Sequence, residues 1–189
     1  FIDEVLKNDE QTLAPTAFIQ STHNSIAGQI ALMLQNYRYN MTIVQKSISF
    51  EMALLDAELQ LETGSAASVL VMPLMGEGAA FFLATAKPQP DTIAKVENIA
   101  TLITGTSMDQ FLQKNKIDIS GFDLILSGDK QLMNPAIPQI NYKEYCGEYF
   151  TAPAFATHLA LEIFRGNLDI PSTSAVKRIL ILNTFGGNY

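Results

Sequence analysis

The sequence predicts an α/β layered fold, and two observations support it. Nearly all-apolar runs such as Ser68–Met72 have the composition of buried central strands. They alternate with helical segments, which is the pattern of sheets covered by helices. Hydrophobic residues make up 48% of the 189 residues and charged residues only 16%, so the chain can bury a large core.

The elements follow in order from periodicity and from chain breakers. Apolar residues at helical spacing, or capping signals, predict helices over residues 1–12, 26–34, 49–63 and 155–164, and a short helix opening at Ser107. Runs rich in β-branched and apolar residues predict strands at Met41–Gln45, Ser68–Met72, Ala79–Thr85, Phe122–Ser127 and Lys177–Asn183. Residues 92–103 fit a helix and a strand equally well. We expect Ser47 or Ser49 to cap the helix that follows them, and that helix to lie largely buried between sheets.

Composition excludes several classes of function. A net charge of −7 makes nucleic acid an unfavourable partner, and no apolar run approaches the roughly 20 residues needed to span a bilayer. Cys146 is the only cysteine, so the chain can form neither an internal disulfide nor a cysteine-based zinc site. We therefore expect a cytoplasmic protein with no cofactor and no metal.

Four segments stand in an informative order. They are Gln20–Leu32, Met41–Ala57, Lys143–Ala154 with its Lys-x-x-x-Gly sequence, and Asn183-Thr-Phe-Gly-Gly-Asn188. Together they resemble the β-ketoacyl synthases of the thiolase superfamily. The resemblance is nearest to the ketosynthase-like proteins of bacterial aryl-polyene and flexirubin-type pigment clusters.

This resemblance makes the expected fold more specific. It implies a thiolase-like layered fold, with helices between two mixed β-sheets, in a single domain over residues 1–189. Residues 1–85 resemble the N-terminal half of the family's domain, and residues 91–189 resemble the C-terminal half. The family's first strands would precede Phe1, and the loop after Val71 is very short, so we expect a truncated or reduced member.

The catalytic residues of the family are mostly replaced. The resemblance places its cysteine nucleophile at Ser47 and its two histidines at Gly128 and Glu148, while Lys143 matches the family's lysine. A carboxylate at residue 148 would repel an enolate rather than stabilise it. The pattern therefore predicts a chain without the cysteine–histidine–histidine chemistry.

Other interpretations of single residues stay open. Ser47 is either an acyl-accepting hydroxyl or a helix cap, and Cys146 is either a displaced nucleophile or a small buried hydrophobe. Glu148 is either a general base or a surface carboxylate. The remaining candidates for a pocket or an interface are His23, Met41, Ile43, Gln45, Phe185, Gly186, Gly187 and Asn188.

The resemblance implies a function and a partner. We expect a non-catalytic, chain-length-factor-like subunit that pairs with an active ketosynthase in fatty-acid-like or polyene biosynthesis, or a homodimer. An acyl carrier protein is a further potential partner, although the acidic chain offers it a poor docking surface. The alternatives are an active synthase or acyltransferase using Ser47 or Cys146, and a stand-alone acyl-binding or structural protein.

Overall fold

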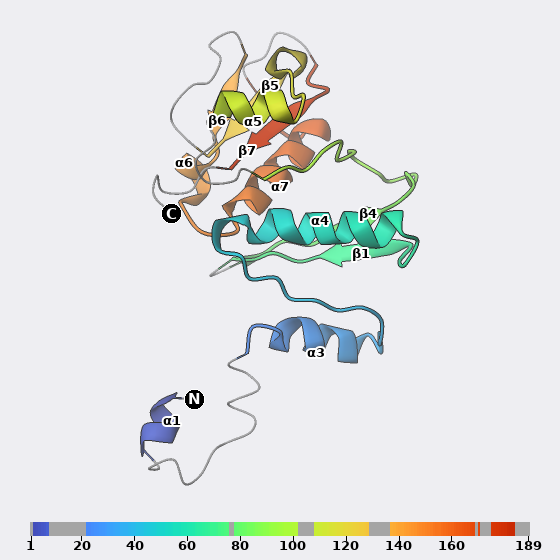
Figure 1. Cartoon of the computed structure of the whole chain (residues 1–189), viewed down its shortest axis with the longest axis vertical. Helices are drawn as coiled ribbons and strands as arrows, with labels where there is room; N and C mark the ends of the chain where they lie inside the picture. The colour runs from blue at the N-terminus through green and yellow to red at the C-terminus, as the bar shows by residue number, and fades with distance from the viewer. Residues whose placement is uncertain are drawn as a thin grey trace. The chain divides into compact units, whose positions relative to one another are not determined.

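The computed structural model describes residues 2–7, 22–75, 78–101, 108–128, 137–168, 170 and 175–183. The chain divides into two units, Phe1–Val44 and Gln45–Tyr189. The first unit contains the helices α1 (Ile2–Lys7) and α3 (Ser25–Met33), labelled in Figure 1. These helices confirm the predictions near residues 1–12 and 26–34, although residues 8–12 lie outside the described part.

The strand expected at Met41–Gln45 is not formed, and that prediction is wrong. The described residues there are irregular, and the described strands pair only with one another. Met41 and Val44 expose 60% and 59% of their surfaces. A β-branched run has the local preference for a strand, but a strand forms only where a second backbone completes its hydrogen bonds.

The second unit contains three sheets. The first two are antiparallel pairs and the third is parallel, with β5 at its centre. Their strands are β1 (Ser68–Val71) with β4 (Phe82–Thr85), β2 (Leu74–Met75) with β3 (Gly78–Ala79), and β6 (Gln139–Asn141), β5 (Leu124–Ser127) and β7 (Ile179–Leu182). The strands predicted at Ser68–Met72, Phe122–Ser127 and Lys177–Asn183 are thus confirmed with shorter bounds, whereas the strand predicted at Ala79–Thr85 is divided between β3 and β4 in two different sheets.

Two helices, α4 (Ser49–Glu62) and α7 (Ala152–Phe164), lie between the sheet of β1 and β4 and the parallel sheet (Figure 1). Phe50 of α4 packs with Val71 of β1 and Ala154 of α7. On its other side, α7 packs against the parallel sheet, in a cluster that includes Leu124 and Leu126 of β5. The order of sheet, two helices and sheet confirms the layered α/β fold.

One face of α4 makes these contacts. Phe50 and Ala57 are its fully buried residues, and most of the others are half-buried. The helix ends as expected near Gly64, whose φ of 71° lies in the left-handed region that glycine adopts at little cost. The expectation of a helix between sheets is confirmed, but only Phe50 and Ala57 are fully buried.

The start of α4 differs from the prediction of a serine cap. Ile48 is the N-cap residue, and no side chain caps the helix. Ser47 lies in the preceding 3-10 turn η1 (Lys46–Ile48), and Ser49 is the first helical residue. The hydroxyl of Ser49 instead accepts a hydrogen bond from the backbone N–H of Gln45 at 2.8 Å. The 3-10 turn moves both serines off the cap position.

The start of α7 lies earlier than the predicted residue 155. Pro153 occupies the first turn, where a proline costs no helical hydrogen bond. The remaining short elements are α5 (Met108–Lys114), which confirms the helix expected after Ser107, η2 (Ile119–Gly121) and α6 (Lys143–Cys146). Residues 92–101 form neither helix nor strand.

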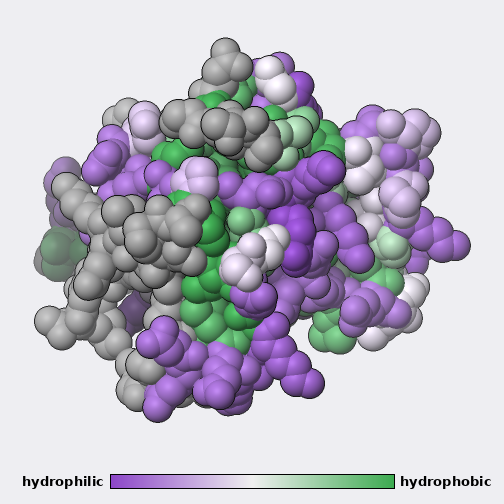
Figure 2. Space-filling model, turned by 90° about the horizontal axis from the view of Figure 1, so that it is seen from above, coloured by the Kyte–Doolittle hydropathy of each residue, from purple (hydrophilic) through white to green (hydrophobic). Residues whose placement is uncertain are grey.

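Hydrophobic residues also reach the surface. Figure 2 shows them in green between hydrophilic residues in purple. In the second unit, Leu70 and Leu83 face each other across β1 and β4 and expose 48% and 68% of their surfaces. Within the described ranges, no helix has the length and apolar character needed to cross a membrane.

Candidate functional site

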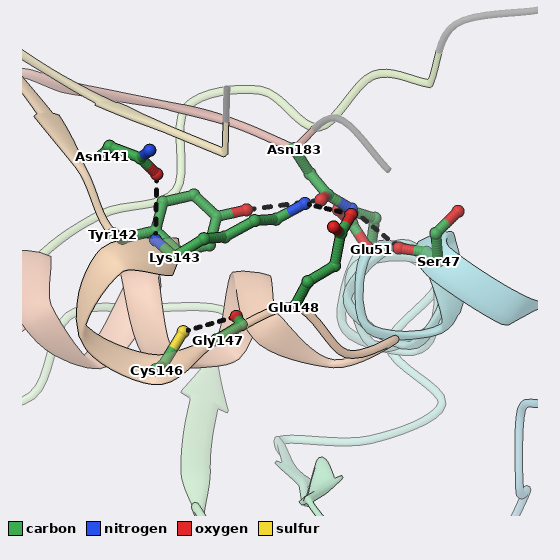
Figure 3. A network of polar contacts seen from close by, with 9 residues as sticks. All are labelled: Ser47, Glu51, Asn141, Tyr142, Lys143, Cys146, Gly147, Glu148 and Asn183. Carbon is green, nitrogen blue, oxygen red and sulfur yellow. Dashed lines mark hydrogen bonds and ion pairs between the residues drawn. The ribbon is translucent and has the colours of Figure 1, made fainter. Parts of the chain in front are cut away.

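Polar side chains collect where the strands of the parallel sheet end. Ser127, Asn141 and Asn183 stand at the carboxyl ends of β5, β6 and β7 or directly after them. In open α/β sheets this edge is where ligands bind. The start of α4 joins the same place through Ser47 and Glu51, as Figure 3 shows.

Asn183 is the centre of this cluster. Its Nδ2 atom donates to the backbone carbonyl of Ser47 at 2.7 Å and to Oε1 of Glu51 at 2.8 Å. Its Oδ1 atom accepts a hydrogen bond from the hydroxyl of Tyr142 at 3.3 Å. One amide therefore ties the end of β7 to the start of α4 and to the residue that follows β6.

Lys143 also enters the site. Its backbone N–H donates to Oδ1 of Asn141 at 3.1 Å, which holds the first turn of α6 against the end of β6. Its ammonium group forms an ion pair with Glu148 at 3.2 Å. The side chain of Lys143 is only 9% exposed, whereas that of Glu148 is 47% exposed. The carboxylate of Glu148 thus partly neutralises the lysine.

Ser47 contributes its backbone rather than its hydroxyl. Its carbonyl faces Asn183, while Figure 3 shows its side chain directed away from Lys143 and Glu148. A serine nucleophile needs a base within hydrogen-bond reach. The described arrangement therefore presents no activated hydroxyl to the cluster.

Cys146 lies at the end of α6. Its thiol contacts the carbonyl of Gly147 at 3.3 Å, and burial raises its pKa above the ordinary thiol value. The pKa of the neighbouring Tyr149 hydroxyl is raised as well, mainly by burial. Since the thiolate is the reactive form, these surroundings favour an inert thiol.

Glu51 is the site residue that sequence reasoning missed. It lies in the first turn of α4, where an acidic residue is usually explained by the helix dipole and is solvent-exposed. Here, desolvation by burial raises the pKa of its carboxyl group. Its only signal in the sequence is its position four residues after Ser47, the expected nucleophile position.

The other predicted residues fall in different places. Gly128 directly follows β5, and its N–H donates to the carbonyl of Leu182 at 2.7 Å, one residue before Asn183. His23, Met41 and Ile43 belong to the first unit, and Gln45 begins the second. Phe185, Gly186, Gly187 and Asn188 lie outside the described residues. Of the residues named from the resemblance, Lys143 and Glu148 contact each other, while Ser47 contacts Asn183 through its carbonyl and Gly128 contacts Leu182.

The cluster offers hydrogen-bond donors and one ion pair rather than a metal site. Within the described part of the chain, no three histidine, cysteine, aspartate or glutamate side chains are grouped to hold a metal ion. Burial also raises the pKa of Tyr142, so its hydroxyl stays protonated and remains a donor. The arrangement can orient polar groups, but its carboxylates are unsuited to stabilising a developing anion.

Comparison with known proteins assigns the family. No curated protein and no solved structure matches the chain. The sequence model described as beta-ketoacyl synthase, N-terminal domain, matches residues 4–108. This range is more than half of the chain, and it includes Ser47 and Glu51 at the start of α4. The chain therefore belongs to the β-ketoacyl synthase family.

Proposed function

We propose that this protein is a non-catalytic, chain-length-factor-like subunit that pairs with an active 3-oxoacyl carrier-protein synthase. The observation that carries the proposal is the ion pair between Lys143 and Glu148. It puts a carboxylate where the resemblance places a histidine, and it uses the retained lysine to hold that carboxylate. A site that must stabilise an enolate oxygen needs donors and positive charge there instead.

The nucleophile position supports the same proposal. Ser47 is bonded through its carbonyl, and its side chain points away from the polar cluster (Figure 3). Cys146, the other residue that could accept an acyl group, has a raised pKa and contacts a backbone carbonyl. Neither residue has the surroundings of an activated nucleophile, so the active-synthase alternative has less support.

The role of the subunit would be to complete the partner's fold and to help shape its acyl tunnel. The pathway we propose is fatty-acid-like or polyene assembly in the cytoplasm, with the acyl carrier protein docking mainly on the active subunit. The net charge of −7 supports docking on the active subunit, because carrier proteins are also acidic and like charges repel each other.

A condensation assay tests this function. The purified protein is incubated with acyl and malonyl thioesters, alone and together with a co-expressed ketosynthase from a neighbouring gene. We expect no product from the protein alone and increased or length-shifted product from the pair. Loss of a single catalytic nucleophile typically costs several orders of magnitude in rate.

The controls are Ser47→Ala and Cys146→Ala. Product made by the wild-type protein alone, and lost in either variant, would refute the non-catalytic proposal and establish the nucleophile. If the protein neither reacts nor changes the partner's products, but binds acyl chains by itself, the stand-alone acyl-binding function replaces the proposal.

A further inference from the structure

Glu51 has a buried carboxyl group that the proposed function does not use. Its Oε1 atom accepts the hydrogen bond from Asn183. Its Oε2 atom is buried and has no hydrogen-bond partner among the residues that the structure describes. Burying an ionised oxygen without a partner is much less favourable than burying a neutral hydroxyl. Desolvation raises the pKa of Glu51 for this reason, although its own backbone N–H, Asn183 and Lys143 act in the opposite direction.

The orientation of Asn183 is fixed from two sides. The hydroxyl of Tyr142 donates to Oδ1, so Nδ2 must face Ser47 and Glu51. Tyr142 is fully buried, which leaves this amide little freedom to turn. The contact between Asn183 and Glu51 joins positions 132 residues apart in the sequence. It is therefore a tertiary link between the end of β7 and the first turn of α4.

The charges around Glu51 do not fully compensate an ionised carboxylate. Lys143 attracts it, but Lys143 is already paired with Glu148, a second negative charge. The hydroxyl of Tyr142, whose pKa is raised, stays neutral. Neither β1 nor β7 contains a titratable residue. The elements η1 and α7, which also contact α4, contribute Lys46, His158 and Glu162.

We propose that Glu51 is a proton-linked latch. In its neutral form the carboxyl group can stay buried where α4 meets the end of β7, whereas its ionisation leaves a charged oxygen buried without a partner and so favours opening. The latch borders Ser47 and Lys143, so its opening would change the polar site as a whole. This proposal stands independently of whether the protein is catalytic.

The direction of the pH effect follows from the raised pKa. In the folded protein Glu51 keeps its proton to a higher pH than in the unfolded chain, where the pKa of its carboxyl group is 4.5. Its stabilising contribution is therefore fully present below pH 4.5 and is lost as the pH rises through the folded pKa. The opening equilibrium changes about tenfold for each pH unit by which the folded pKa exceeds the unfolded one.

The experiment compares the wild type with Glu51→Gln between pH 4 and pH 8. Glutamine keeps an acceptor for Asn183 and a neutral group in place of Oε2, so it imitates the protonated latch at every pH. Hydrogen exchange is measured at the amides of residues 50–54, with intrinsic rates corrected for pH. We expect protection in the wild type to fall as the pH rises, and protection in Glu51→Gln to stay level. Parallel profiles for the two proteins would overturn the latch.

A matched control and a direct titration complete the test. Glu58→Gln removes one carboxylate from the same helix without touching Asn183, and we expect it to follow the wild type. If Glu51→Gln does not fold, the carboxyl carbon of Glu51 is titrated by NMR in the wild type. A midpoint clearly above 4.5 supports the latch, whereas a midpoint at the ordinary glutamate value contradicts it.

Discussion

Single side chains join distant parts of the second unit by binding backbone groups. Asn183 reaches the carbonyl of Ser47, and the hydroxyl of Thr151 donates to the carbonyl of Leu74 at 3.0 Å. Such contacts satisfy backbone carbonyl groups at places where the chain leaves its helices and strands. The residues that make them are short polar side chains at the ends of elements.

Tyr142 allows a direct test of the cluster around Asn183. Tyr142→Phe removes the hydroxyl and leaves Oδ1 of Asn183 without this donor. We expect a loss of about 0.5–1.5 kcal/mol in the free energy of unfolding, measured by urea denaturation. Tyr145→Phe is the control, because Tyr145 is 73% exposed. Equal stability of the two variants would show that the hydroxyl of Tyr142 contributes nothing.

The hydrogen bonds of Asp123 predict that the protein loses stability in acid. Its carboxylate accepts hydrogen bonds from the backbone N–H groups of Lys177 and Arg178 at 2.8 and 2.9 Å, and these bonds lower its pKa. A lowered pKa means that stability is present above the unfolded value, about 3.9, and is lost as the pH falls through the folded value. We expect the wild type to lose stability on acidification more steeply than Asp123→Asn, in thermal unfolding between pH 6 and pH 2.5. Asp91→Asn, at an exposed position, should keep the wild-type slope, and a matching slope for Asp123→Asn would contradict the expectation.

At the scale of elements, the sequence predicts those helices and strands whose formation depends on local composition. The fully buried strand at Leu124–Ser127 is nearly all apolar, and this pattern is specific to a strand covered on both faces. Met41–Gln45 has a similar local preference but no partner strand, and pairing is a property of the whole chain. Likewise, sequence motifs single out Lys143 and Ser47 as candidates, whereas the burial of Glu51 arises only when β7 and α4 meet.

The layered packing predicts a contrast between two phenylalanines. Phe50 of α4 is 3% exposed and lies 5.5 Å from the ring of Phe82 of β4, whereas Phe81 is 60% exposed. Phe50→Ala should lower the free energy of unfolding by about 3–5 kcal/mol, because it leaves a cavity between helix and sheet. Phe81→Ala should change it by about 0.5 kcal/mol or less. Similar effects of the two substitutions in chemical denaturation would mean that α4 does not pack on this sheet.

At the scale of the whole molecule, the proposed function requires a second subunit. The resemblance implies that the subunit contact forms through the segment that leads to the expected nucleophile position, and we propose Met41–Gln45 as that segment. Tyr37, Tyr39 and Met41 are 83%, 54% and 60% exposed, and Tyr and Met are types enriched in the cores of interfaces. The segment that forms no strand by itself would then gain its missing partner from another chain.

Ile43→Asp tests this association. A charge at residue 43 would be buried without a partner in the complex, so we expect the variant to lose binding to a co-expressed ketosynthase and any self-association. Val96→Asp is the control, since it introduces the same charge at a residue that is 57% exposed and outside the proposed interface. Association is followed by light scattering coupled to gel filtration, and circular dichroism checks that each variant is folded.

An interface of the expected kind buries on the order of 2,000 Å² or more, so the wild-type complex should survive dilution to micromolar concentration. A folded wild-type protein that remains monomeric with and without the ketosynthase would remove the basis for the subunit proposal. If Ile43→Asp and Val96→Asp both prevent association, the interface is not specific to Met41–Gln45.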